Sequence, residues 1–442
     1  MRVLMLAYFY PPLGGAGVQR SLKFSKYLPE FGITPSIISA DSSAYTQDSS
    51  LLAEVPAEIE VLRLRHTPMM ARLLSLARRH ARARAPTVSR GTVQSGGGAT
   101  VGRWRDRALR AVGALQFPDD KVAWSRQVVP AALRLIEQTP IDLVYSSAPP
   151  VSAHLAAMQV AHRARVPWVA DFRDLWTENP AYSAPRWRRA LDRRLESRLL
   201  AAADGIVTVS EHLAAALAER VKPGVPVLNI PNGYDEADFA GATAREREPG
   251  KFCIVHAGTF YGHQSPVSFL RGVERLFEDE PEARERLRIR FVGNVGSRFD
   301  PFLTSFERRA PGVLERIGHV QHHRALAEIL AADALLLVIG GDSESAAGVM
   351  TGKLFEYLRA GRPILLLGAP NGEAAQLLRR TGAGEALDHD EPSHIAALLS
   401  RWMAGDMPRP VLESAAAYER RALAGRLGEF LGAVHDRFHG RD

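Results

Sequence analysis

The chain has 442 residues, of which 46% are hydrophobic and 24% charged, and its formal net charge is +7. This length exceeds what one hydrophobic core usually supports and therefore predicts two domains. The apolar runs are too short to span a bilayer, which excludes an integral membrane protein, and a single cysteine, Cys253, excludes an internal disulfide and is typical of a reducing cytoplasm.

The first half of the chain alternates short β-branched runs with longer helical patterns. This alternation is expected of a parallel sheet covered by helices. The strand candidates are residues 2–8, 34–40, 59–65, 141–147, 166–172, 205–210 and 225–232.

Between the third and fourth of these candidates, residues 72–110 form a basic segment in which many arginines interrupt an apolar pattern around a Gly/Ser-rich centre. Two interpretations stay open, a solvated arginine face and contact with an anionic membrane surface. No aromatic stacking pattern or DNA-binding motif accompanies the charge, so a nucleic acid is not an expected partner.

The strand–helix pattern then restarts, with strand candidates at residues 251–262, 288–294, 314–320, 334–340, 363–370 and 384–389. The restart predicts an α/β protein with two doubly wound domains, residues 1–240 and 251–411. A polar linker is expected within residues 235–251. The segment 412–438 has a helical pattern and is expected to pack back on the first domain.

Ligands of open parallel sheets bind beyond the carboxyl ends of the strands, so the loops there are the candidate sites. The first such loop, "YFYPPLGGAGVQR", contains Gly14, Gly15 and Gly17 ahead of a helix that begins near Val18. Glycines allow a ligand to approach the backbone, and free helix amides attract anions. The spacing is not the dinucleotide fingerprint, and a tight turn without a ligand is the alternative.

A second loop, "ADFRDLW", places Asp171, Arg173, Asp174 and Trp176 directly after a buried strand. Three charged groups are costly to desolvate unless they pair or hold a ligand. The loop therefore predicts a functional site, and an internal salt-bridge cluster is the alternative.

The second half repeats the strand–glycine–helix pattern in "HAGTFYG", where Gly258, Thr259 and Gly262 can expose amides to phosphate oxygens. The strand-end turn "FVGN" adds Gly293 and Asn294. These loops predict a phosphate-binding edge of the second sheet.

The stretch "GKLFEYL" combines Gly352, Lys353 and Glu356 at the start of a predicted helix. Lys353 can bind phosphates, and Glu356, one turn later, can accept hydrogen bonds from a sugar diol. This combination favours nucleotide binding, with an amphipathic helix carrying an exposed Lys/Glu pair as the alternative.

The order of "PPLGGAGVQR", "VTVSEHL…NIPNGYD", "HAGTFYG", "FVGN" and "KLFEYLRAGRPIL" resembles the retaining glycosyltransferases of the GT-B fold, in particular family 4 and its bacterial members that build surface polysaccharides. The resemblance implies two Rossmann-like domains facing a central cleft. It also implies a hexosyltransferase-like enzyme (EC 2.4) that moves a sugar from a nucleotide-diphosphate sugar, held by the second domain, to a lipid-linked or polysaccharide acceptor. Such an enzyme is expected in the cytoplasm, or peripherally at the inner face of the cell membrane through residues 72–110.

The resemblance also implies roles for individual residues. Glu356 is expected to bind the ribose hydroxyls, and Gly14 and Gly15 to lie against the donor diphosphate with Arg20 as charge partner. The backbone at His319 and Val320 is expected to contact the base. Asp171 and Arg173 occupy the strand end where relatives contact the transferred sugar, and the expected acceptor residues are Gly17, Asp174 and Trp176.

The sequence departs from the family pattern at the position of one glutamate, which is Gly348 here, and Glu344 or Asp342 is the candidate substitute. His263 and Gln264 stand where a basic pair is usual, which leaves the phosphate charge to Lys353 and Arg20. No cluster with metal-ligand spacing occurs, so metal independence is expected, with the sugar nucleotide as substrate and no further cofactor. The alternative functions are a non-catalytic sugar-nucleotide-binding protein and a GT-B epimerase or phosphorylase.

Overall fold

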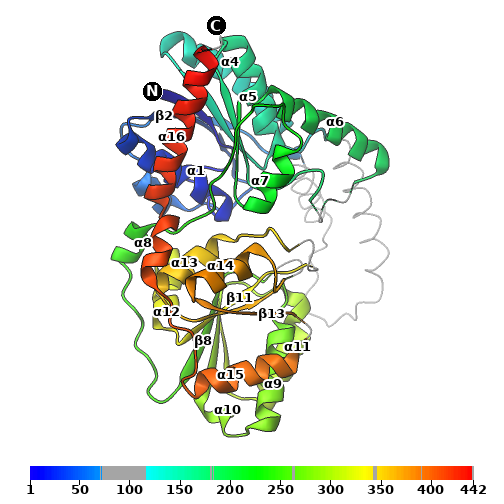
Figure 1. The fold of residues 1–442 in the computed structure, drawn as a ribbon, viewed down its shortest axis with the longest axis vertical. Coiled ribbons are helices and arrows are strands. Elements are labelled where there is room, and N and C mark those ends of the chain that lie inside the picture. The colour runs from blue at the N-terminus through cyan, green and yellow to red at the C-terminus, as the bar shows by residue number, and fades with distance from the viewer. Residues whose placement is uncertain are drawn as a thin grey trace, which may run out of the picture. The chain divides into compact units, whose positions relative to one another are not determined.

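The computed structural model describes residues 1–69, 71, 116–179, 182, 184–260, 264–341, 346–389 and 391–440. The chain forms two compact units (Figure 1). The first unit comprises Met1–Thr208, Ala214–Asn229 and Ala424–Asp442, and the second comprises Val209–Leu213 and Ile230–Leu423. Residues 230–240, placed in the first domain by the sequence pattern, group with the second unit. The basic segment 72–110 lies outside the described residues.

A seven-stranded parallel sheet forms the centre of the first unit, in the order β3-β2-β1-β4-β5-β6-β7. Leu4 of β1 pairs with Ser36 of β2 on one side and with Val144 of β4 on the other, so the strand order reverses next to β1. The strands are β1 Arg2–Leu6, β2 Thr34–Asp41, β3 Val61–Arg65, β4 Leu143–Ala148, β5 Trp168–Phe172, β6 Gly205–Thr208 and β7 Val227–Asn229.

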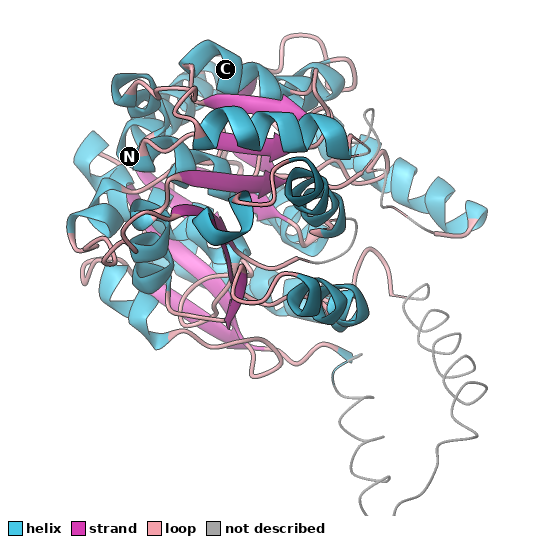
Figure 2. Ribbon diagram, turned by 90° about the horizontal axis from the view of Figure 1, so that it is seen from below, coloured by secondary structure: helices cyan, strands magenta, loops and turns pink. Residues whose placement is uncertain are grey.

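Helices connect these strands and cover the sheet (Figure 2). They are α1 Ala16–Tyr27, α4 Val122–Gln138, α5 Val151–Ala164, α6 Arg186–Ala202 and α7 Glu211–Ala218, with 3₁₀ turns η1 Leu28–Phe31 and η2 Ser49–Glu54. Strands β1, β4 and β5 are almost wholly buried, and their near-continuous apolar sequences are those of a sheet packed on both faces.

The last helix, α16 Arg420–His439, returns the end of the chain to the first unit. Its Val434 and Phe430 side chains lie against Gly205, where a Cβ atom would come within 2.8 Å of Val434. Close packing at the start of β6 therefore requires glycine there.

The second unit has a six-stranded parallel sheet in the order β10-β9-β8-β11-β12-β13. Its strands are β8 Phe252–Ala257, β9 Leu287–Val292, β10 Leu314–Gly318, β11 Ala334–Val338, β12 Ile364–Leu367 and β13 Gly384–Leu387. Its helices are α8 Glu236–Ala240, α9 Val267–Asp279, α10 Ala283–Arg286, α11 Asp300–Arg309, α12 His322–Ala331, α13 Gly352–Ala360, α14 Glu373–Thr381 and α15 Pro392–Met403, with 3₁₀ turns η3 Ser297–Phe299 and η4 Leu412–Tyr418.

Both units have the strand order of doubly wound sheets, which confirms the predicted α/β class with two Rossmann-like sheets. Every strand candidate of the sequence corresponds to one of these strands. None of the described helices is both long enough and apolar enough to cross a membrane.

Candidate functional site

In the first unit, the loop after β1 brings glycines to the beginning of α1. Gly15 is the N-cap residue, with φ +100, a left-handed conformation that favours glycine. No side chain caps this helix, and its first turn contains no acidic residue. The first amides of α1 therefore remain suited to an anion. Gly14 is held by a hydrogen bond from its amide to the Thr46 carbonyl (2.9 Å).

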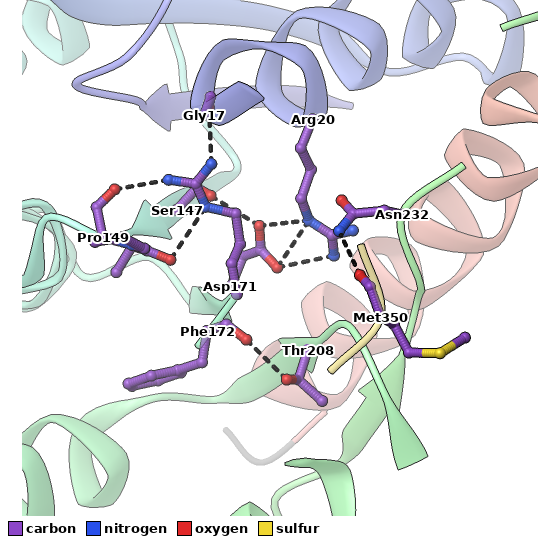
Figure 3. A network of polar contacts seen from close by, with 11 residues as sticks. Gly17, Arg20, Ser147, Pro149, Asp171, Phe172, Thr208, Asn232 and Met350 are labelled. Atoms are coloured by element: carbon purple, nitrogen blue, oxygen red, sulfur yellow. Dashed lines mark hydrogen bonds and ion pairs between the residues drawn. The ribbon is translucent and has the colours of Figure 1, made fainter. Parts of the chain in front are cut away.

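Arg20 and Asp171 form a buried ion pair behind this loop (Figure 3). Arg20 is one turn into α1 and 2% exposed, and Asp171 lies near the end of β5 and is 0% exposed. Arg20 donates from Nε to Oδ2 (2.9 Å) and from Nη2 to Oδ1 (2.9 Å), and the Ser147 hydroxyl donates to Oδ2 (2.8 Å). Burial alone would raise the pKa of Asp171, but the charge and hydrogen bonds of Arg20 outweigh it and lower the pKa.

The Arg20–Asp171 ion pair differs from the ligand-facing roles predicted for these two side chains. From the sequence, Arg20 is expected to face a phosphate and Asp171 to face the transferred sugar. In the structure the Arg20 guanidinium and the Asp171 carboxylate are directed at each other and are covered from solvent. In this conformation they join α1 to β5 and hold the glycine loop in place.

Arg173 joins the same strand ends through backbone carbonyls (Figure 3). It donates from Nη1 to the Gly17 carbonyl (2.7 Å), from Nη2 to the Pro149 carbonyl (2.7 Å) and from Nε to the Ala148 carbonyl (3.2 Å). One side chain thereby fixes the loops that follow β1, β4 and β5. A guanidinium supplies such a fork of donors, which lysine cannot reproduce.

Asp174 and Trp176, the other two predicted site residues of the "ADFRDLW" loop, line a cavity of about 250 Å³ beyond the ends of β4 and β5. Asp174 offers an exposed carboxylate there, and Trp176 offers an aromatic face. The remaining lining residues are mostly apolar: Ala148, Pro149, Val151, Phe172, Leu175, Asn179 and Tyr182. An aromatic wall with one carboxylate can stack on a sugar ring and accept hydrogen bonds from its hydroxyls.

In the second unit, the backbone turns after β8 and β9 lie against each other. Gly258 donates its amide to the Val292 carbonyl (2.7 Å), and Phe260 donates to the Asn294 carbonyl (3.0 Å). Gly258 and Gly293 both have φ +130, and a Cβ atom on Gly293 would lie 2.4 Å from the Gly258 carbonyl oxygen. Only glycine at both positions permits this approach. Thr259 is half-buried beside these turns.

Lys353 is a cation at this edge of the sheet that forms no ion pair with a described residue. It is half-buried in the first turn of α13, a turn that begins at Gly352 with no side-chain cap and no acidic residue. Within the described residues it forms no hydrogen bond, and the charge of Glu356 offsets the effect of its burial only in part. Desolvation lowers the pKa of Lys353 to about 8. Its side chain crosses Gly258, where a Cβ atom would lie 2.3 Å from Lys353 Cε.

Glu356 lies one turn further along α13 and is 28% exposed. Its Oε1 atom is 3.0 Å from Nε2 of His322, the first residue of α12. His319 and Val320, expected near a base, follow β10, where Gly318 adopts φ +74 and forms a bridge with Gly293. The carboxyl ends of β8, β9 and β10 and the start of α13 thus bring together most of the predicted donor residues.

Some predicted residues are not placed by the structure. Gly262 and Glu344, with the neighbouring candidates His263 and Asp342, lie outside the described residues. Gly348 is described, and a Cβ atom there would lie 2.8 Å from Cδ2 of His212. The His212 ring therefore occupies the space that a glutamate at position 348 would enter.

Sequence reasoning missed Ser147 and Tyr357, which orient the two candidate sites. Ser147 binds Asp171, and the Tyr357 hydroxyl accepts a hydrogen bond from the Ala257 amide (2.8 Å), which fixes α13 to the end of β8. Burial raises the pKa of Tyr357 and keeps it neutral. Ser147 could have been found from the sequence, because it is a polar residue near the end of a buried strand. Nothing in the sequence indicates that Tyr357 contacts β8.

The match to known proteins agrees with this architecture. Residues 93–238 match the model of Glycosyltransferase Family 4. No curated protein matches the sequence at a significant level.

Among solved structures, a glycosyltransferase from Rickettsia africae is 13% identical, with a TM-score of 0.59 over 98% of both chains. HepE from Anabaena in complex with UDP is 13% identical, with a TM-score of 0.55 over 100% of this chain and 99% of that chain. Sucrose-phosphate synthase from Thermosynechococcus elongatus is 11% identical, with a TM-score of 0.56 over 99% of this chain and 97% of that chain. The chain therefore has the GT-B fold, and within it residues 93–238 carry the match to Glycosyltransferase Family 4.

Proposed function

We propose that this protein is a glycosyltransferase that moves a sugar from a nucleoside-diphosphate sugar to a lipid-linked or polysaccharide acceptor of the cell envelope. The observation that carries the proposal is the half-buried ammonium group of Lys353 at the uncapped start of α13, without a counter-ion among the described residues. A buried cation needs an anionic partner, and a diphosphate supplies one. The family 4 match and the UDP complex of HepE support the same interpretation.

The donor roles follow from the second unit. The Thr259 amide between Gly258 and Phe260, the uncapped first amides of α13 and the Lys353 ammonium bind the diphosphate, and Glu356 accepts hydrogen bonds from the ribose hydroxyls. The Glu356 carboxylate contacts His322 in the structure. When the donor binds, the ribose hydroxyls replace this histidine as its hydrogen-bond partner. The backbone after β10, at His319 and Val320, contacts the base. Glu344 and Gly262 retain their proposed roles at the transferred sugar and the phosphates.

The reaction breaks the bond between the anomeric carbon and the diphosphate oxygen, and forms a bond from that carbon to an acceptor hydroxyl, whose proton leaves with the diphosphate. Lys353 and the helix amides stabilise the charge that grows on the leaving diphosphate. A fixed cation and oriented amides provide this stabilisation without a metal ion, so we propose a metal-independent enzyme. Retention of the anomeric configuration is proposed from the family resemblance.

The first unit is proposed to hold the acceptor. Arg20, Asp171 and Arg173 act as positioning residues, because their contacts orient α1 and the strand-end loops. The cavity lined by Asp174 and Trp176 binds an acceptor sugar, with Gly17 in the adjoining loop.

Replacing Trp176 by alanine is expected to raise KM for the acceptor about tenfold or more, since aromatic contacts of this kind contribute on the order of 1 kcal/mol beyond the buried area. The value of kcat and the affinity for the nucleotide are expected to stay within about twofold. Steady-state kinetics with a membrane-extracted acceptor measure all three. A Leu52→Ala variant, which removes an exposed apolar side chain of the first unit outside the cavity, is the control. An unchanged acceptor KM in Trp176→Ala would remove the cavity from the acceptor site.

The function itself is tested with a panel of UDP-, GDP- and dTDP-sugars. A ligand at a hundredfold its dissociation constant stabilises the protein by about 2.7 kcal/mol, which a thermal-shift assay detects. The sugar nucleotides that stabilise it are then incubated with membrane extract. A glycosyltransferase consumes the donor and makes a lipid-extractable or polymeric product. Donor conversion that needs no acceptor would identify an epimerase, and binding without any turnover would identify a binding protein.

A further inference from the structure

Helix α6 presents an outward face that contains basic and apolar side chains but no acidic ones. Its exposed residues are Arg186, Trp187, Ala190, Leu191, Arg193, Arg194, Ser197, Arg198 and Ala202. Trp187 is 53% exposed and Leu191 is 41% exposed. The helix lies at the outer edge of the first unit, where its label stands in Figure 1.

The acidic residues of α6 are turned inward and are neutralised there. Asp192 is 1% exposed and binds Arg188 Nε at 2.9 Å, with a further hydrogen bond from the Tyr182 hydroxyl. Glu196 is 0% exposed and binds Arg220 Nη2 at 2.6 Å, with a further hydrogen bond from the Thr177 hydroxyl. Within the described part of the chain, the exposed arginines of α6 have no such partner. The outward face therefore carries an uncompensated positive charge.

The apolar and basic groups share one stripe of the helix. Trp187, Leu191, Arg194 and Arg198 follow the spacing i, i+4, i+7 and i+11, which places them on the same side. Exposed apolar groups surrounded by cations have the composition of a membrane-interface helix.

We propose that the outward face of α6 binds the surface of a membrane that contains anionic lipids. The arginines contact lipid phosphates, and Trp187 and Leu191 enter the boundary between headgroups and acyl chains, where tryptophan is favoured. Charge alone would also suit a nucleic acid. The exposed Trp187 and Leu191 side chains favour the lipid, since a nucleic-acid backbone offers nothing apolar to cover Leu191. The proposal goes beyond the transfer reaction and does not depend on it.

The test uses the full chain and co-sedimentation with vesicles of phosphatidylcholine, with or without phosphatidylglycerol. Each basic residue near an anionic surface contributes about fivefold in affinity, so Arg194→Glu with Arg198→Glu is expected to weaken binding to the anionic vesicles more than about tenfold. Trp187→Ser with Leu191→Ser keeps every charge and is expected to weaken binding severalfold. Arg379→Glu with Arg380→Glu, an adjacent pair exposed on α14, is the control and is expected to bind as the unaltered protein does.

Two further measurements make the result specific. Anionic vesicles are expected to shift the tryptophan emission to shorter wavelength, and Trp187→Phe is expected to remove most of that shift. The thermal midpoint and the response to UDP are expected to be unchanged in all α6 variants, which separates membrane binding from folding and from the donor site. The proposal is overturned if both double variants of α6 bind anionic vesicles like the unaltered protein, or if the protein prefers duplex DNA to these vesicles.

Discussion

Replacing Lys353 by methionine is expected to weaken the binding of the preferred nucleoside diphosphate by about tenfold to 150-fold. This range corresponds to the ~1.5–3 kcal/mol of a hydrogen bond to a charged group. Methionine keeps the length and apolar stem of the side chain that crosses Gly258, so the loss reports the charge. Isothermal titration calorimetry of the unaltered and altered proteins measures the difference.

The matched control is Lys251→Met, which removes the same charge just before β8, at the opposite edge of the sheet. It is expected to leave nucleotide affinity unchanged. Equal affinities for the unaltered protein and Lys353→Met would remove Lys353 from the donor site.

The pKa of Lys353 adds a pH dependence to this prediction. The diphosphate binds the protonated amine, so its affinity is expected to fall as the pH rises through about 8, and Lys353→Met is expected to lose this dependence. The stability of the unliganded protein depends on pH in the opposite direction. Between pH 8 and the ordinary lysine pKa of 10.5, the unfolded chain binds more protons, so the contribution of Lys353 to stability becomes more favourable as the pH rises.

Replacing Asp171 by asparagine is expected to reduce the free energy of unfolding by about 3–5 kcal/mol, because it leaves the buried Arg20 guanidinium without a counter-ion. Denaturant unfolding followed by circular dichroism measures this change. Asp279→Asn, which breaks the half-exposed pair with Arg275, is the control and is expected to cost about 1 kcal/mol or less. A cost for Asp171→Asn no larger than that of the control would show that the pair does not hold the first unit together.

Two further measurements distinguish the charge pair from simple loss of a side chain. In a double variant with Arg20→Met and Asp171→Leu the cost is expected to be smaller than the sum of the two single variants, because neither charge remains buried alone. The pKa of Asp171 is lowered in the folded state, so its contribution to stability is present above pH 3.8 and is lost as the pH falls below that value. From about pH 5 to about pH 3, Asp171→Asn is therefore expected to lose less stability than the unaltered protein.

The strand candidates of the sequence correspond to strands of the two sheets because buried parallel strands carry apolar runs that differ clearly from helical periodicity. The glycines at positions 15, 258 and 293 were identifiable for a similar reason, since strand-to-helix turns require backbone conformations that glycine adopts. The local sequence pattern was therefore sufficient to predict the strands and these glycine turns.

Pairings between distant residues were not predictable. Arg20 and Asp171 are 151 positions apart. No local sequence pattern shows that an arginine in α1 neutralises a carboxylate near the end of β5. For the same reason, Arg173 was expected to face a ligand, although its donors bind carbonyls of neighbouring loops. The contact of His212 with Gly348 also joins distant positions, and it accounts for a departure from the family pattern that the sequence alone left unexplained.

The central claim is that the second unit binds a nucleoside diphosphate at the turns after β8 and β9, with Lys353 at the phosphates and Glu356 at the ribose. A crystal structure with the nucleotide that gives the largest thermal shift tests it most directly. The account predicts a phosphate oxygen within hydrogen-bond distance of Lys353 Nζ and ribose hydroxyls donating to the Glu356 carboxylate. A nucleotide bound elsewhere, with both side chains facing only solvent, would contradict it.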